Sequence, residues 1–99
     1  MALQTDSNAS TLKNTEKRIT WLIKQLSHRD WLFRAKAAIS LKQLGPQPQA
    51  MTALMRALKD PHYLVRYHAA DALKQMELPE TEAALKQWEA EEEEWIGKR

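Results

Sequence analysis

Three histidines, His28, His62 and His68, are the side chains of this sequence that come nearest to catalytic or metal-binding chemistry. A zinc site needs three or four protein ligands at short, regular spacings, such as two histidines on one helix face with a carboxylate nearby. His62 and His68 are six positions apart, on either side of an expected helix start, and His28 is remote in sequence. We therefore interpret all three as ordinary surface histidines and expect no metal.

Other signatures of catalysis are missing from the sequence. The chain has no cysteine, which excludes a thiol nucleophile and disulfides and fits a reducing compartment. It has no glycine-rich phosphate loop and no G-x-S-x-G elbow. The acidic run Glu91–Glu94 is typical of a solvated helix face, the alternative being a docking element for a basic partner. We expect neither enzymatic activity nor a cofactor.

The net charge of +2 is the sum of two unlike regions. Up to Lys74 the chain has 12 lysines and arginines against 5 acidic residues, and from Gln75 onward it has 3 against 8. A basic body with an acidic tail is suited to a nucleic acid, to an anionic protein surface, or to its own other end. No apolar run approaches the roughly 20 residues of a membrane span. We therefore expect no membrane insertion, and the absence of cysteine makes the cytoplasm the expected location.

An internal repeat organises the elements that must position these side chains. The segment HRDWLFRAKAAISL (28–41) returns 32 positions later as DPHYLVRYHAADAL (60–73), without a gap. The similarity extends backward over a preceding segment, so each unit contains two segments. Matching pairs are Thr20/Thr52, Leu22/Leu54, Lys24/Arg56, Leu26/Leu58, Leu32/Leu64, Arg34/Arg66, Ala37/Ala69, Ala38/Ala70 and Leu41/Leu73.

Both segments of each unit have helical periodicity. The apolar stripes of the first segments are Ile19, Leu22, Ile23 and Leu26, and Met51, Leu54, Met55 and Leu58. Those of the second segments are Phe33, Ala37, Leu41 and Leu44, and Val65, Ala69, Leu73 and Met76. The sequence also predicts Asp30 as an N-cap, Gly45 just after a helix end, and Pro79 in the first turn of a last helix.

We predict an all-α fold, a short α-solenoid of two helical hairpins with a C-terminal capping helix. The expected helices cover about residues 14–27, 31–44, 49–59, 63–77 and 79–96. Residues 1–13 are expected to be a flexible segment, 14–78 to hold the two repeats (about 19–49 and 51–81 by alignment), and 79–99 to form an acidic capping helix and tail. The capping helix is expected to take the place of the first helix of a third unit. The residues with which it should pack on the second hairpin are Ala84, Leu85 and Trp88.

The second unit resembles the HEAT-like repeat, most closely the short variety named after phycobilisome lyases. The matching residues are Leu54, Leu58, Asp60, Pro61, Val65, Arg66, Ala69, Ala70, Ala72 and Leu73. The first unit departs from the pattern at His28, Arg29 and Phe33, where the family has Asp, Pro and Val. The resemblance implies a ladder of polar contacts between units, for which the structural positions are Asp60, Arg34 and Arg66. It also implies an interaction function, with a phycobiliprotein or photosynthetic complex as one partner.

Aromatic and polar residues of the second helices form the candidate partner surface, because second helices line the concave face of arrays that look like this. Trp31 and Tyr63 are equivalent, and form either a stacked row closing the seam between units or a row presented outward. Trp95 is expected to be an exposed docking residue near the terminus. The predicted partner-binding residues are Trp31, Lys36, Gln43, Tyr63, Tyr67, His68, Gln75 and Trp95.

The predicted function is a non-catalytic protein–protein interaction module, such as an adaptor, scaffold or assembly factor. One alternative is an accessory factor for phycobiliproteins or phycobilisomes, either bilin lyase-like or acting in disassembly. The other is nucleic-acid binding through the basic repeat surface, which the acidic tail and Asp71 disfavour. A small homo-oligomer is compatible with all three.

Overall fold

The computed structural model describes the backbone of residues 2–97 and the side chains of residues 14–94. Over this backbone there are five α-helices and no strand, which confirms the all-α prediction. The helices are α1 (Ala2–Gln25), α2 (Trp31–Gln43), α3 (Met51–Ala57), α4 (Tyr63–Met76) and α5 (Pro79–Gly97), and a 3-10 turn at Pro48–Ala50 leads into α3. Within residues 2–97, no helix is both long and apolar enough to cross a membrane.

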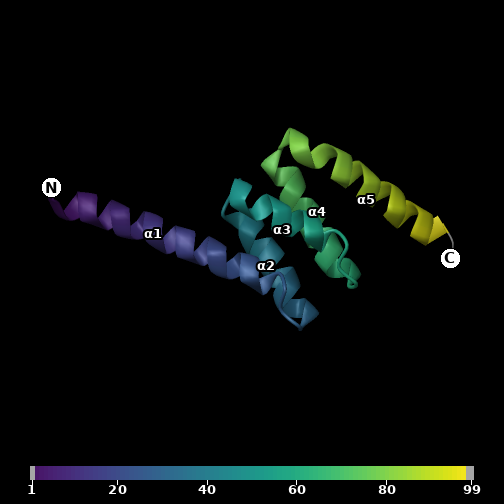
Figure 1. The fold of residues 1–99 in the computed structure, drawn as a ribbon, viewed down its shortest axis with the longest axis horizontal. Helices are drawn as coiled ribbons and strands as arrows, with labels where there is room; N and C mark the ends of the chain where they lie inside the picture. Colours follow the sequence, from purple (N-terminus) through teal and green to yellow (C-terminus); the bar gives the residue numbers. More distant parts are fainter. Residues whose placement is uncertain (1, 98–99) are drawn as a thin grey trace.

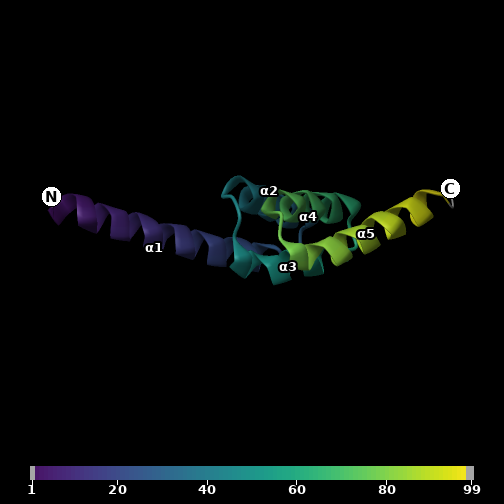
Figure 2. The same ribbon diagram turned by 90° about the horizontal axis from the view of Figure 1, so that it is seen from above.

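The helices lie in two layers, one made of the first helices of the units and the other of the second helices. Figures 1 and 2 show α1, α3 and α5 in one layer and α2 and α4 side by side in the other. Small buried residues at the middle of α2 and α4, among them Ala38 and Ala70, let the two helices approach closely. The largest fully buried side chains are Leu41, Leu54, Leu73, Val65 and Thr81.

The predicted helix ends are confirmed by their capping geometry. Asp30 accepts a hydrogen bond from the backbone N–H of Leu32 at 3.0 Å and so caps α2. Gly45, just beyond α2, has a φ of 88°, a left-handed conformation that favours glycine. Pro79 opens α5, and Glu80 and Glu82 follow in its first turn, where the helix dipole favours acids.

Helix α1 begins much earlier than predicted. It starts at Ala2 instead of near residue 14, so the helix includes the stretch that we expected to be a flexible segment. That stretch lacks the apolar periodicity of a packed helix, but it contains no glycine or proline. Because adding residues to an existing helix is far easier than starting one, a helix anchored by Ile19 and Leu22 extends backward through such a stretch.

The prediction that Phe33 belongs to the core stripe of α2 is wrong, because its side chain is 46% exposed. Its equivalent in the second unit, Val65, is 0% exposed because the preceding unit covers it. Among the described residues no other unit covers this side of the first hairpin, and the ring of Phe33 lies 4.5 Å from that of His28. The prediction for α5 is confirmed, since Ala84, Leu85 and Trp88 are partly buried against the core.

Candidate interaction surface

Arg34 joins the two units through a polar contact that is largely shielded from water. Its Nε donates to Asp60 Oδ2 at 2.7 Å and its Nη2 to Asp60 Oδ1 at 3.1 Å, a bidentate pair. Nη1 also donates to the backbone carbonyls of His28 and Arg29. Arg34 therefore fastens the loop of its own unit to the loop of the next unit.

Arg66 repeats this arrangement with α5. Its Nη1 donates to the carbonyls of Asp60 and Pro61, and its Nε donates to Glu92 Oε1 at 2.6 Å. Each of the two arginines is 26 residues before its carboxylate partner. Glu92 also stands 32 positions after Asp60, which is the repeat period. Helix α5 therefore corresponds to the first helix of a third unit, because it lies in the layer of the first helices and supplies the carboxylate at the equivalent repeat position.

Two lysines at another repeat position add a second set of links. Lys42 Nζ lies 2.7 Å from Asp71 Oδ2 and ties α2 to α4, while Lys74 Nζ lies 3.0 Å from Glu89 Oε1 and ties α4 to α5. These pairs are more exposed than those of the arginines, so each contributes little to stability, about 0.5 kcal/mol. These ion pairs instead help to hold neighbouring helices in register.

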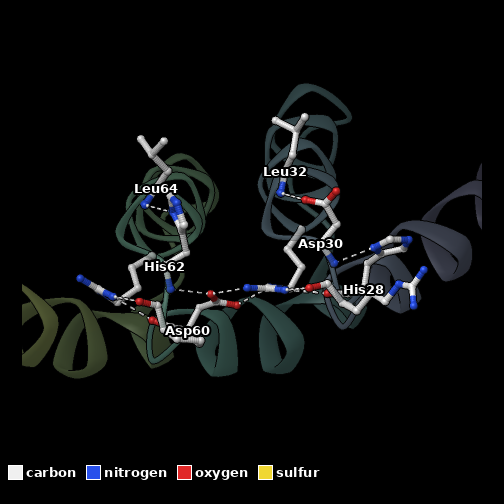
Figure 3. Close-up of polar contacts among 10 residues, drawn as sticks. His28, Asp30, Leu32, Asp60, His62 and Leu64 are labelled. Atoms are coloured by element: carbon white, nitrogen blue, oxygen red, sulfur yellow. Dashed lines mark hydrogen bonds and ion pairs between the residues drawn. The ribbon is translucent and has the colours of Figure 1, made fainter.

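The loops before α2 and α4 use the same two acceptor types in exchanged order (Figure 3). In the first unit the backbone N–H of Asp30 donates to Nδ1 of His28, and Asp30 then caps α2. In the second unit the N–H of His62 donates to Asp60, and Nδ1 of His62 accepts from the N–H of Leu64. At the first position of the loop the acceptor is an imidazole nitrogen in the first unit and a carboxylate oxygen in the second. At the second position the two acceptors are exchanged. The departure of His28 from the family pattern leaves the loop intact, because Arg34 takes its carboxylate from the second unit.

An exposed row of stacked rings, the aromatic row, crosses from α2 to the start of α4 and consists of Trp31, His62 and Tyr63. The rings of Trp31 and His62 are stacked with centroids 3.9 Å apart, and those of His62 and Tyr63 are 5.6 Å apart. Trp31 and Tyr63 are both exposed. The row therefore combines the two alternatives left open by the sequence, since it stacks across the seam and also faces outward.

The remaining predicted residues divide between two places. Tyr67 is exposed one turn beyond Tyr63 and meets His68 edge to face at 5.3 Å, so it extends the aromatic row. Lys36 lies instead over the ring of Phe33, at 5.9 Å from its centroid. Gln43 and Gln75 are exposed on α2 and α4. The side chain of Trp95 lies outside the described side chains.

A groove of about 480 Å³ separates α3 from α5 in the first-helix layer. Met55, Leu58 and Ala84 give it apolar walls, and Arg56 and Lys59 add cations. Trp88 also lines it, and the indole Nε1–H of Trp88 is buried without a hydrogen-bond partner among the described residues. Among residues 14–94, no three His, Asp or Glu side chains are arranged to hold a metal ion.

Sequence reasoning missed His62 and Trp21. His62 was interpreted as a surface histidine, but it is the central ring of the aromatic row and the N-cap of α4. Its equivalence to the N-cap Asp30 in the repeat alignment is the signal that identifies the capping role. Trp21 is 57% exposed on α1, and helical periodicity places it outside the buried stripe that contains Ile19 and Leu22.

Antiparallel hairpins stacked with a 32-residue period and joined by regularly spaced arginines define an α-solenoid. A family model described as HEAT repeats matches residues 19–99. The chain therefore belongs to the HEAT repeat family, and its matched region includes α5 as well as the two hairpins. No curated protein and no solved structure matches the chain significantly. HEAT repeats are commonly protein-interaction modules.

Proposed function

We propose that this protein is a non-catalytic interaction module that binds a partner protein through the aromatic row and Tyr67. The observation that carries the proposal is the stacking of Trp31, His62 and Tyr63, which fixes large rings in place at an exposed edge. Rings that are already ordered lose little conformational entropy on binding. Trp and Tyr are also the residue types that dominate binding energy in protein interfaces.

A comparison of repeat positions supports the choice of Tyr67. Its equivalent in the first unit is Ala35, which is 4% exposed because α4 covers it, whereas Tyr67 is 55% exposed. A tyrosine at a position that a neighbouring helix would otherwise cover presents an apolar ring and a hydroxyl together. The matching partner surface is an apolar groove with hydrogen-bond acceptors at its rim.

The narrower form of this proposal is that the partner is a phycobiliprotein or another photosynthetic complex, with this chain acting in assembly or disassembly. It is supported by the sequence resemblance alone. Nucleic-acid binding receives less support, because Arg34, Lys42, Arg66 and Lys74 are occupied by carboxylates of the same chain. Cations that are already paired contribute little to phosphate binding.

The test is affinity purification of the tagged protein from nuclease-treated extract of its native host. The informative variant is Tyr63→Ala with Tyr67→Ala, and the matched control is Trp21→Ala, an exposed aromatic on another surface. We expect a defined protein to elute with the parent and with the control and to be lost with the double variant. A phycobiliprotein in that fraction would show the visible absorbance of its bilin.

Two results would contradict the proposal. The first is a partner that the double variant retains at the parent's level. The second is elution of nucleic acid, with no protein, from extract that was not treated with nuclease. Far-ultraviolet circular dichroism of the double variant separates loss of binding from loss of the fold.

A further inference from the structure

The outer side of the first hairpin carries two exposed aromatic side chains, Trp21 on α1 and Phe33 on α2. Together with Leu22 and Ala37 they line a groove of about 250 Å³. In the second unit the positions equivalent to Trp21 and Phe33 are Ala53 and Val65, and the first hairpin packs against that side. Large rings have thus replaced small side chains at the uncovered side.

Three lysines surround these rings, and we call the five residues Trp21, Phe33, Lys17, Lys24 and Lys36 the first-hairpin end. All three lysines are exposed, and none has a carboxylate partner among the described residues. Lys17 and Lys24 line a shallow hollow beside Trp21 together with one acid, Glu16, and Lys36 lies over Phe33, so the cations outnumber the acid around these rings. Aromatic rings among these cations fit an acidic segment, because its carboxylates can pair with the lysines while the methylene groups of its glutamates contact the rings.

Helix α5 supplies such a segment at the other end of the molecule. Glu91, Glu93 and Glu94 are exposed and have no cationic partner among the described residues, and we call them the acidic face of α5. Glu89 and Glu92, in contrast, are used by Lys74 and Arg66. The acidic face therefore remains available after α5 has packed on its own body.

The first-hairpin end and the acidic face of α5 cannot meet within one chain. The second hairpin lies between the first hairpin and α5, and α1 and α5 extend from the body in opposite directions in both views (Figures 1 and 2). The residues that precede Lys17 continue α1 as a straight helix and do not fold back over the first hairpin. A contact between the two charged surfaces therefore requires two molecules.

We propose that the first-hairpin end binds the acidic face of α5 of a second copy of this chain. The contact joins two different surfaces, so association is head-to-tail, and it gives a closed ring or an open chain according to the rotation between neighbouring copies. Because exposed ion pairs are screened by salt, the association weakens as ionic strength rises. The contact uses none of the residues of the aromatic row, so it is independent of the proposed function.

Sedimentation velocity over a hundredfold range of protein concentration tests the proposal, in about 20 mM and about 500 mM salt. We expect the average mass of the parent to rise with concentration at low salt. At high salt it should stay at the mass of the monomer. The substitutions Lys24→Glu with Lys36→Glu should abolish the rise, as should Glu91→Lys with Glu93→Lys and Glu94→Lys. The matched control is Arg29→Glu with Lys86→Glu, which changes two other exposed cations that have no carboxylate partner among the described residues, and it should associate as the parent does.

An equimolar mixture of the two charge-reversed proteins provides the decisive measurement. Each protein alone repels its own copies, but the two have complementary ends, so the mixture should regain concentration-dependent association. A parent that is monomeric at every concentration and low salt would overturn the proposal. So would a mixture that stays monomeric while both proteins keep their helical circular dichroism, loss of association in the control, or association that depends on copurified nucleic acid.

Discussion

The covered seam between the two hairpins and the two uncovered sides of the solenoid use the same repeat positions with different residues. Val65, at the seam, is fully buried, whereas its equivalent Phe33 is 46% exposed on the first hairpin. Ala35, at the seam, is 4% exposed, whereas its equivalent Tyr67 is 55% exposed on the second. Small side chains thus lie where helices must approach, and large rings lie on sides of α2 and α4 that no other described helix covers.

This difference shows that a repeat position alone does not decide whether a residue is buried. In a solenoid each unit contacts only its neighbours, so the same position is core in one unit and surface in the next. Large apolar residues on the uncovered sides cost solubility and contribute nothing to the seam. Their presence there marks surfaces that are suited to binding.

The largest expected effect comes from breaking the arginine contact at the seam. Arg34→Ala leaves the carboxylate of Asp60 poorly hydrated and without its cation, so we expect a loss of about 4 kcal/mol in the free energy of unfolding. Arg66→Ala removes the equivalent contact with the more exposed Glu92, and we expect about 2 kcal/mol. Urea denaturation of both variants measures the difference. An equal or larger loss for Arg66→Ala would contradict the ranking.

Truncation of Val65 and of its equivalent Phe33 should have different effects on stability, because one is buried at the seam and the other is exposed. Val65→Ala leaves a cavity in the core, and we expect it to lower the free energy of unfolding by about 2 kcal/mol. Phe33→Ala removes a ring that is nearly half exposed, so its cost should be below about 1 kcal/mol although more atoms are lost. Thermal denaturation gives the order of the two, and a reversed order would disprove the assignment of Phe33 to the surface.

The cap and stacking roles of His62 give a smaller effect. His62→Ala removes the acceptor for the N–H of Leu64, and we expect a loss of about 1 kcal/mol in the free energy of unfolding. His62→Asn restores a capping oxygen without the stacked ring, so it should recover most of this loss. His68→Ala is the control, with a change within about 0.5 kcal/mol. Equal losses for the alanine and asparagine variants would show that stacking, and not capping, stabilises the fold.

The smallest effect is expected at the helix ends, where Gly45 and Glu77 are equivalent. Both have a left-handed backbone, with φ of 88° and 52°, but only the first unit has glycine there. Glu77→Gly removes the steric cost of a side chain in this conformation and should raise the free energy of unfolding by about 0.5 kcal/mol. Glu77→Ala keeps that cost and should change stability less. A stabilisation of the same size by alanine would assign the effect to charge.

Most of the fold could be predicted from the sequence because the features that mark the repeats depend on residues close together in the chain. Helical stripes, the Asp30 cap, Gly45 and Pro79 each depend on residues within a turn or two. The extension of α1 to Ala2 was not predictable from such signals, because a helix continues through residues that have no packed face.

The candidate surface was predicted only in part. The equivalence of Trp31 and Tyr63 indicated a row, but the ring between them belongs to His62, whose type gave no sign of stacking. Lys36 was grouped with Tyr67 because second helices line the concave face of similar arrays, yet it lies over the exposed ring of Phe33. The 32-residue period does not specify which side of each helix a neighbour covers.

By itself, the sequence determined the all-α class, the two-hairpin solenoid, the capping helix and the repeat positions of Arg34 and Arg66, since these follow from periodicity and local capping. Only the tertiary structure decided that Arg34 takes its carboxylate from the second unit and that Glu92 serves Arg66. It alone decided that Phe33 is exposed and Val65 is not. Pairing and burial depend on which helices lie beside a residue, and neighbours that are distant in sequence are fixed only when the chain has packed.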